Sequence, residues 1–145
     1  NARLLQTAEK EALAFLGGGG VRMPLVVFGI NESAQTLDAE ELMLYDVDQH
    51  RAEMIARLGR EVVRRESGTL KMSVAKSPEE AVDGASFVLN SVRVGGIGSR
   101  AHDERAAMQC GYPGQETTGP GGVAMGQRTI PVAIPGSTLT KTCST

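Results

Sequence analysis

Short apolar runs alternate with glycine-rich, polar and helical segments along most of the chain. Four runs have the length and composition of buried strands, at 13–16, 42–45, 70–74 and 85–89. The segments 21–30 and 49–66, and a short one between Pro78 and Gly84, favour helices. Strands that alternate with helices through short connections form an open, doubly wound, mostly parallel sheet, in which ligands bind beyond the carboxyl ends of the strands. The pattern therefore predicts a Rossmann-like α/β fold.

Two of the predicted helices carry additional local signals. In 49–66 apolar side chains recur at helical spacing, and Glu53 with Arg57 and Glu61 with Arg65 are placed for i,i+4 ion pairs. Ser77, followed by a proline and two glutamates, has the pattern of a helix N-cap with a capping box.

The C-terminal part has a weaker pattern. We expect a helix over 97–110, a Gly- and Thr-rich loop over 111–122 and a further apolar segment over 123–134. Residues 1–12 are interpreted as a polar leading tail, and residues 135–145, which are rich in Ser and Thr without a hydrophobic period, as an unstructured tail. The prediction is thus one domain over 13–134.

Composition narrows the classes of partner. The net charge is −2, with 15 Lys and Arg against 17 Asp and Glu and no long run of either sign, which argues against nucleic acid and against a polybasic membrane surface. We find neither an apolar stretch of the ~20 residues that a membrane span needs nor a signal peptide, so we expect a cytoplasmic protein. Aromatic residues make up only 3%, too few for a sugar-binding surface of stacked rings.

Four consecutive glycines, Gly17, Gly18, Gly19 and Gly20, lie between the first predicted strand and helix. Backbone N–H groups without neighbouring Cβ atoms, together with the dipole of a helix N-terminus, can hold a pyrophosphate. Gly17 and Gly19 meet the first two positions of G-x-G-x-x-G, but Arg22 occupies the third. From the glycines alone, a phosphate-binding loop and a plain flexible turn are both open interpretations.

Asp46 follows the second predicted strand, where an acid accepts hydrogen bonds from the hydroxyls of an adenosine ribose. It lies farther from Gly17 than the usual ~20 residues, which indicates an insertion. A carboxylate there repels a 2′-phosphate, so we expect NAD rather than NADP. Asp48 is more simply the N-cap of the following helix.

Two further segments carry specific motifs: N-S-V-R-V-G-G followed by S-R-A-H-D-E-R, and G-Q-E-T-T-G-P-G-G-V-A followed by R-T-I-P. With the glycine turn and the L-Y-D-V-D strand end, they closely resemble glycoside hydrolase family 4 over about 13–134. Members of this family are NAD- and divalent-metal-dependent 6-phospho-glucosidases and their relatives.

This resemblance implies a mechanism and a set of residues. The family is thought to oxidise the sugar C3 hydroxyl with NAD, remove the acidified C2 proton, eliminate the leaving group, add water and return the hydride. Gly17 to Gly20 and Asp46 match its NAD site, Arg100 matches an arginine that contacts the phosphosugar, and Glu116 matches a glutamate said to raise the basicity of a tyrosine base. Arg93, Asp103 and Gln115 match strongly patterned positions without an assigned role.

The resemblance also sets expectations for the whole protein. The metal-binding Cys and His, a substrate-binding Asn and the Tyr base of the family lie downstream of Thr145. We therefore expect an N-terminal piece of a longer enzyme, truncated after the first half of the family fold and inactive alone. The full-length protein is expected to be a homo-oligomer that uses NAD and a divalent metal, Mn²⁺ by preference, on a phosphorylated sugar.

A 6-phospho-β-glucosidase is the preferred activity, with α- against β-linkage left open. Two alternatives stand beside it: the coenzyme domain of a 2-hydroxy-acid dehydrogenase, against which the loop Gln115–Gly122 argues, and a non-catalytic nucleotide-binding module.

Overall fold

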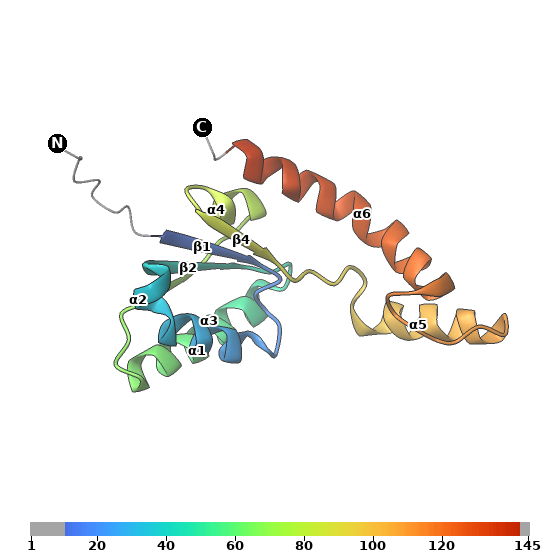
Figure 1. Ribbon diagram of the computed structural model, residues 1–145, viewed down its shortest axis with the longest axis horizontal. Helices are drawn as coiled ribbons and strands as arrows, with labels where there is room; N and C mark the ends of the chain where they lie inside the picture. Colours follow the sequence, from blue (N-terminus) through green and yellow to red (C-terminus); the bar gives the residue numbers. More distant parts are fainter. Residues whose placement is uncertain (1–10, 143–145) are drawn as a thin grey trace. The chain divides into compact units, whose positions relative to one another are not determined.

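The computed structural model describes residues 11–142, which form two compact units divided between Ser91 and Val92 (Figure 1). The single domain expected over 13–134 is thus described as two units, each by itself. The first unit contains β1 (Glu11–Leu16), α1 (Met23–Glu32), α2 (Ala34–Leu37), β2 (Ala39–Tyr45), α3 (Gln49–Arg65), β3 (Lys71–Val74), α4 (Pro78–Val82) and β4 (Phe87–Asn90). The second contains α5 (Gly96–Gln109) and α6 (Gly119–Thr142).

The four strands form one parallel sheet in the order β3-β2-β1-β4. Helices α1 and α3 lie on one side of this sheet and α4 lies on the other (Figure 1). This arrangement confirms the predicted doubly wound, Rossmann-like α/β fold. In the register, Leu16 pairs with both Tyr45 and Asn90, so β1, β2 and β4 end at the same edge.

The core of the first unit lies between the sheet and the pair α1 and α3. Leu42, Leu44 and Val27 are fully buried there, with Met23 nearly so. Leu42 and Leu44 project from one face of β2 because alternate residues of a strand share a face. At ~25 cal/mol per Å² of apolar area removed from water, this packing is the main stabilising term of the unit.

Ion pairs and caps on α3 and α4 largely follow the sequence prediction. Glu61 binds Arg65 at 2.8 Å as predicted, whereas Glu53 binds Arg60 at 3.1 Å instead of the predicted Arg57. The Ser77 hydroxyl accepts a hydrogen bond from the N–H of Glu80 at 3.2 Å, which confirms the predicted cap of α4.

In the second unit, α5 packs against α6. The loop predicted over 111–122 is wrong for its last part, because α6 begins at Gly119. A Cβ at Gly121 would lie 2.4 Å from the Gln115 carbonyl oxygen, and one at Gly122 would lie 2.6 Å from that of Thr117. These glycines therefore let the preceding loop fold back onto the first helical turn.

Both predicted tails were partly wrong within the described residues. Glu11 and Ala12 belong to β1, because the Glu11 N–H donates to the Asp38 carbonyl at 2.9 Å and the Ala12 carbonyl accepts from Ser86 at 2.8 Å. The tail expected over 135–145 is helical as far as Thr142, because backbone hydrogen bonds suffice for a helix without a hydrophobic period. Residues 1–10 and 143–145 lie outside the described part. No helix within 11–142 is long and apolar enough to cross a bilayer.

Candidate functional site

The glycine turn follows β1 directly and is held against the end of β2. The N–H groups of Gly17 and Gly18 both donate to the Tyr45 carbonyl, at 2.8 and 2.9 Å. Gly17 has φ +91°, a conformation that residues with a side chain rarely adopt. The chain then enters α1 at Met23, with Arg22 as an N-cap whose side chain makes no capping hydrogen bond.

The other three glycines have different surroundings. A Cβ at Gly18 would lie 2.9 Å from the Leu44 Cβ, and one at Gly19 would lie 2.8 Å from Asp46 Oδ2. At Gly20 the nearest atom would be the Gly17 oxygen, at an ordinary contact distance of 3.6 Å. Internal packing therefore requires glycine at 18 and 19, whereas Gly20 leaves room for a group from outside.

Asp46 lies beside this turn. Its Oδ2 accepts from the Gly19 N–H at 2.9 Å and its Oδ1 accepts from the Asp48 N–H at 3.0 Å. A carboxylate has about four lone-pair positions, so these two bonds leave acceptor capacity for ribose hydroxyls. Asp48 accepts from the Arg51 N–H at 3.0 Å, which confirms it as the N-cap of α3. The turn and Asp46 thus fit a dinucleotide, with space at Gly20 and acceptors at Asp46.

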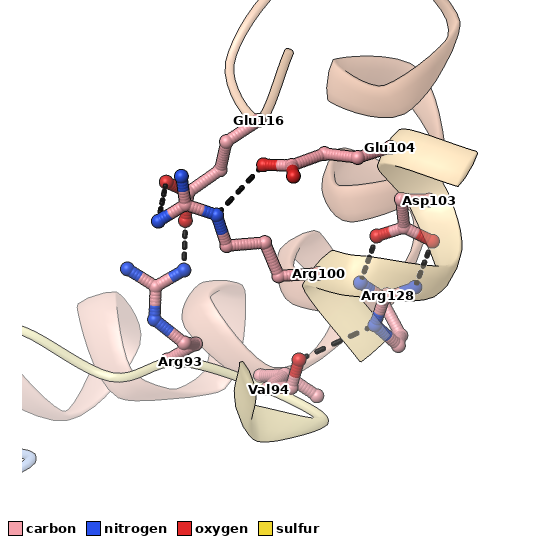
Figure 2. Close-up of polar contacts among 7 residues, drawn as sticks. All are labelled: Arg93, Val94, Arg100, Asp103, Glu104, Glu116 and Arg128. Atoms are coloured by element: carbon pink, nitrogen blue, oxygen red, sulfur yellow. Dashed lines mark hydrogen bonds and ion pairs between the residues drawn. The ribbon is translucent and has the colours of Figure 1, made fainter. Parts of the chain in front are cut away.

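A second cluster of charged side chains lies in the other unit (Figure 2). Glu116, in the loop before α6, receives the guanidinium of Arg93 on one carboxylate oxygen and that of Arg100 on the other, the latter at 3.0 Å. The Nε of Arg100 also donates to Glu104, one turn along α5, at 2.8 Å. Two cations on one carboxylate form a group that can exchange its internal anion for an external one.

A partly buried ion pair lies next to this cluster. Arg128 on α6 binds both carboxylate oxygens of Asp103 on α5, at 3.2 and 2.5 Å, and donates from Nε to the Val94 carbonyl at 3.2 Å (Figure 2). Asp103 is 6% exposed. Hydrogen bonds from Arg128 lower the pKa of Asp103, and the same carboxylate raises the pKa of Arg128.

Both groups line one pocket of this unit, whose charged wall consists of Arg93, Arg100, Asp103, Glu116 and Arg128. Of the residues that the sequence singled out, the structure brings Gly19 and Asp46 together in the first unit and Arg100 and Glu116 together in the second. His50 and His102 are both exposed.

The sequence profile described as "Family 4 glycosyl hydrolase" matches residues 12–136. The chain belongs to glycosyl hydrolase family 4. This membership decides against the 2-hydroxy-acid dehydrogenase alternative.

Family 4 relatives with curated names or solved structures include both α- and β-glucosidases. The chain is 34% identical over 125 residues to the 6-phospho-alpha-glucosidase 1 of Lacticaseibacillus paracasei, covering 86% of this chain and 28% of that protein. Its fold is similar, at a TM-score of 0.85 and 31% identity, to a 6-phospho-alpha-glucosidase from gut microorganisms in complex with NAD and glucose-6-phosphate, covering 92% of this chain and 31% of that one.

The fold is equally similar to the 6-phospho-beta glucosidase of Thermotoga maritima with manganese, NAD⁺ and glucose-6-phosphate, at a TM-score of 0.86 and 27% identity, over 92% of this chain and 32% of that one. The chain therefore spans less than a third of the length of these three family 4 relatives.

Unlike the dinucleotide site, a divalent-metal site is not formed by the residues that the structure describes. Within residues 11–142, no three His, Cys, Asp or Glu side chains gather as metal ligands would. These residues do not by themselves fit a divalent metal.

Arg128 is a pocket residue to which the sequence analysis assigned nothing. A signal was present, because Arg128 is the single charged residue between Glu116 and Lys141. An isolated charge in a largely apolar helix indicates a buried partner, which the structure identifies as Asp103.

Proposed function

We propose that this chain is the NAD-binding portion of a 6-phospho-glycosidase that cleaves glycosidic bonds of phosphorylated sugars. The observation that carries the proposal is the arrangement of Arg93 and Arg100 on the two oxygens of Glu116, in a pocket of a family 4 chain. Family 4 relatives in complex with NAD and glucose-6-phosphate support the choice of ligands.

For the dinucleotide, the proposed residues are Gly17 to Gly20 and Asp46. The open side of Gly20 would admit the pyrophosphate close to the backbone, and the remaining acceptor positions of Asp46 would receive ribose hydroxyls. The negative charge of Asp46 disfavours the 2′-phosphate of NADP. When bound, NAD supplies a hydride acceptor for oxidation of the sugar, and the chain binds and orients it.

For the sugar phosphate, the proposed residues are Arg100 and Arg93. A guanidinium binds phosphate through two parallel N–H donors, and a dianionic phosphate competes well with a single carboxylate for two such groups. Phosphate binding would release Glu116 from at least one arginine. Glu116 is then proposed to act on the tyrosine base that the family resemblance implies.

The assignment of residues 13–134 to one NAD-binding Rossmann-like domain stays a proposal. Because the relatives include α- and β-glucosidases, the preference for the β-linkage stays a prediction, as do the role of Mn²⁺, the cytoplasmic location and the homo-oligomeric state.

The test is calorimetric titration of the 145-residue chain with NAD and with glucose-6-phosphate. We expect both to bind, and R100A to weaken glucose-6-phosphate at least about tenfold without affecting NAD. R105A is the matched control, since Arg105 lies on the same helix, is exposed and donates to the Ala101 carbonyl of its own helix. The proposal is contradicted if the wild-type chain fails to bind NAD or fails to bind glucose-6-phosphate.

Hydrolysis by the same chain is a separate question. We expect no turnover of p-nitrophenyl 6-phospho-glucosides of either anomer with NAD and Mn²⁺. NAD binding without sugar-phosphate binding would instead favour a non-catalytic nucleotide-binding module.

A further inference from the structure

The ion pair between Asp103 and Arg128 takes no part in the ligand contacts proposed above, yet it connects three segments of the second unit. Arg128 comes from α6 and Asp103 from α5, and the third contact of Arg128 is the Val94 carbonyl in the segment that precedes α5. The Nε–H and one N–H on each of Nη1 and Nη2 of Arg128 are therefore used within the protein.

The surroundings of this pair leave little freedom. Asp103 is 6% exposed, whereas the Arg128 side chain is 32% exposed, so removing Arg128 would leave a buried carboxylate without its cation. The backbone segment 94–95 is also closely packed against Arg128. Gly95 has φ +83°, and a Cβ there would lie 2.2 Å from Ser99 Oγ and 3.1 Å from the Arg128 Nε. The backbone at Val94 and Gly95 is thus held close against the guanidinium.

The two anchor points of Arg128 are next to the two arginines of the candidate site. Val94 directly follows Arg93 in the chain, and Asp103 lies three residues after Arg100, on the same side of α5. Arg128 therefore contacts the residue next to Arg93 and a residue one helical turn from Arg100.

We propose that Asp103 and Arg128 are positioning residues that hold Arg93 and Arg100 at the separation needed to bind the phosphate of a phosphorylated sugar. This inference rests on the proposed function for the ligand, whereas its structural part concerns only the arginine pair. A planar fork with three fixed donors performs this task, because it sets both distance and orientation between α5 and the 93–95 segment. Lysine offers a point charge and cannot make the three contacts in one geometry.

The experiment compares R128K and D103N with the control R105K in the 145-residue chain. The first readout is the ¹⁵N NMR spectrum of the arginine Nε–H groups, whose signals respond to the ion pairs that the same guanidinium groups of Arg93 and Arg100 make through Nη1 with Glu116. The second is glucose-6-phosphate affinity by calorimetry, and the third is the thermal midpoint. R105K alters an exposed arginine of α5 and should leave all three unchanged.

We expect R128K and D103N to shift the Nε–H signals of Arg93 and Arg100 and to weaken glucose-6-phosphate by about ten- to a hundredfold, since small misplacements of binding groups cost this much. A lower thermal midpoint with unchanged Nε–H signals and unchanged affinity would overturn the proposal, because the pair would then be merely structural. Unfolding of both variants would overturn it for the same reason.

Failure of the proposed function gives a different result. If the wild-type chain binds no glucose-6-phosphate, the ligand assignment is wrong, and the Nε–H signals of Arg93 and Arg100 in R128K and D103N still decide whether the pair positions them.

Discussion

The carboxylate of Asp46 accepts a hydrogen bond from the backbone N–H of Gly19 at 2.9 Å. This bond ties the turn after β1 to the end of β2. Because a Cβ at Gly19 would lie only 2.8 Å from the same oxygen, the acid and the glycine depend on each other. Asp46 therefore shapes the turn as well as offering acceptors to a ribose.

The two last glycines of the turn should respond differently to alanine. We expect G19A to lower the free energy of unfolding by about 1–3 kcal/mol, because its methyl group overlaps the Asp46 carboxylate, and to weaken NAD. G20A should change stability by less than about 0.5 kcal/mol and still weaken NAD. Urea unfolding and NAD calorimetry on both variants test this, and equal NAD affinity of G20A and wild type would remove Gly20 from the site.

The charge of Asp46 should set the choice between NAD and NADP. We expect D46N, which keeps an oxygen for the Gly19 N–H, to bind NAD more weakly and to raise the NADP-to-NAD affinity ratio. D48N is the matched control, since Asn caps a helix about as well as Asp and the residue lies two positions away. Unchanged affinities for both dinucleotides in D46N would exclude Asp46 from the ribose site.

The N-cap of α3 should contribute about 1 kcal/mol to the free energy of unfolding. Removing the Asp48 carboxylate by D48A leaves the Arg51 N–H without its acceptor, so we expect a loss of ~1 kcal/mol in the free energy of unfolding. D48N should recover most of that loss. A D48A variant as stable as wild type in urea would show that water replaces the cap without cost.

In the core of the first unit, truncating a side chain on β2 should cause the largest loss in the free energy of unfolding. Leu44 is fully buried, so L44A is expected to cost about 2–5 kcal/mol through lost transfer free energy and a residual cavity. L58A, on the exposed side of α3 at 49% exposure, should cost far less. Denaturant unfolding followed by amide signals of the first unit compares the two, and similar losses would contradict the packing described.

Glu61 should titrate far below its usual range. Hydrogen bonds from Arg64 and Arg65 lower its pKa from 4.5 to about 2. A carboxyl whose pKa is lowered in the folded state stabilises that state above its unfolded pKa, and the contribution disappears as the pH falls from about 4.5 to about 2. Carboxyl ¹³C titration should give this pKa, and the stability difference between wild type and E61Q should vanish below that window. A Glu61 midpoint near 4.5 at low salt would show that these exposed ion pairs do not persist in solution.

Much of the fold was predictable because each strand and helix carries its own local pattern. The run 13–16, the glycines after it and the apolar period of 49–66 predicted β1, its turn and α3. The ends of the structured region were not predictable in this way. Pairing of Ala12 with Ser86 extends β1 into a polar segment, and α6 continues as far as Thr142, beyond its last hydrophobic period.

The candidate sites, like the fold, were predictable from the sequence only in part. Residue type and order alone suggested a dinucleotide at Gly17–Gly20 and Asp46, with a plain turn left open for the glycines, whereas Arg100 and Glu116 were assigned through the family resemblance of their motifs. Which of these residues touch was decided by tertiary structure. Glu116 meets Arg93 and Arg100, and Arg128 meets Asp103, across gaps in the sequence that only the packing of α5 against α6 and the adjoining loop closes.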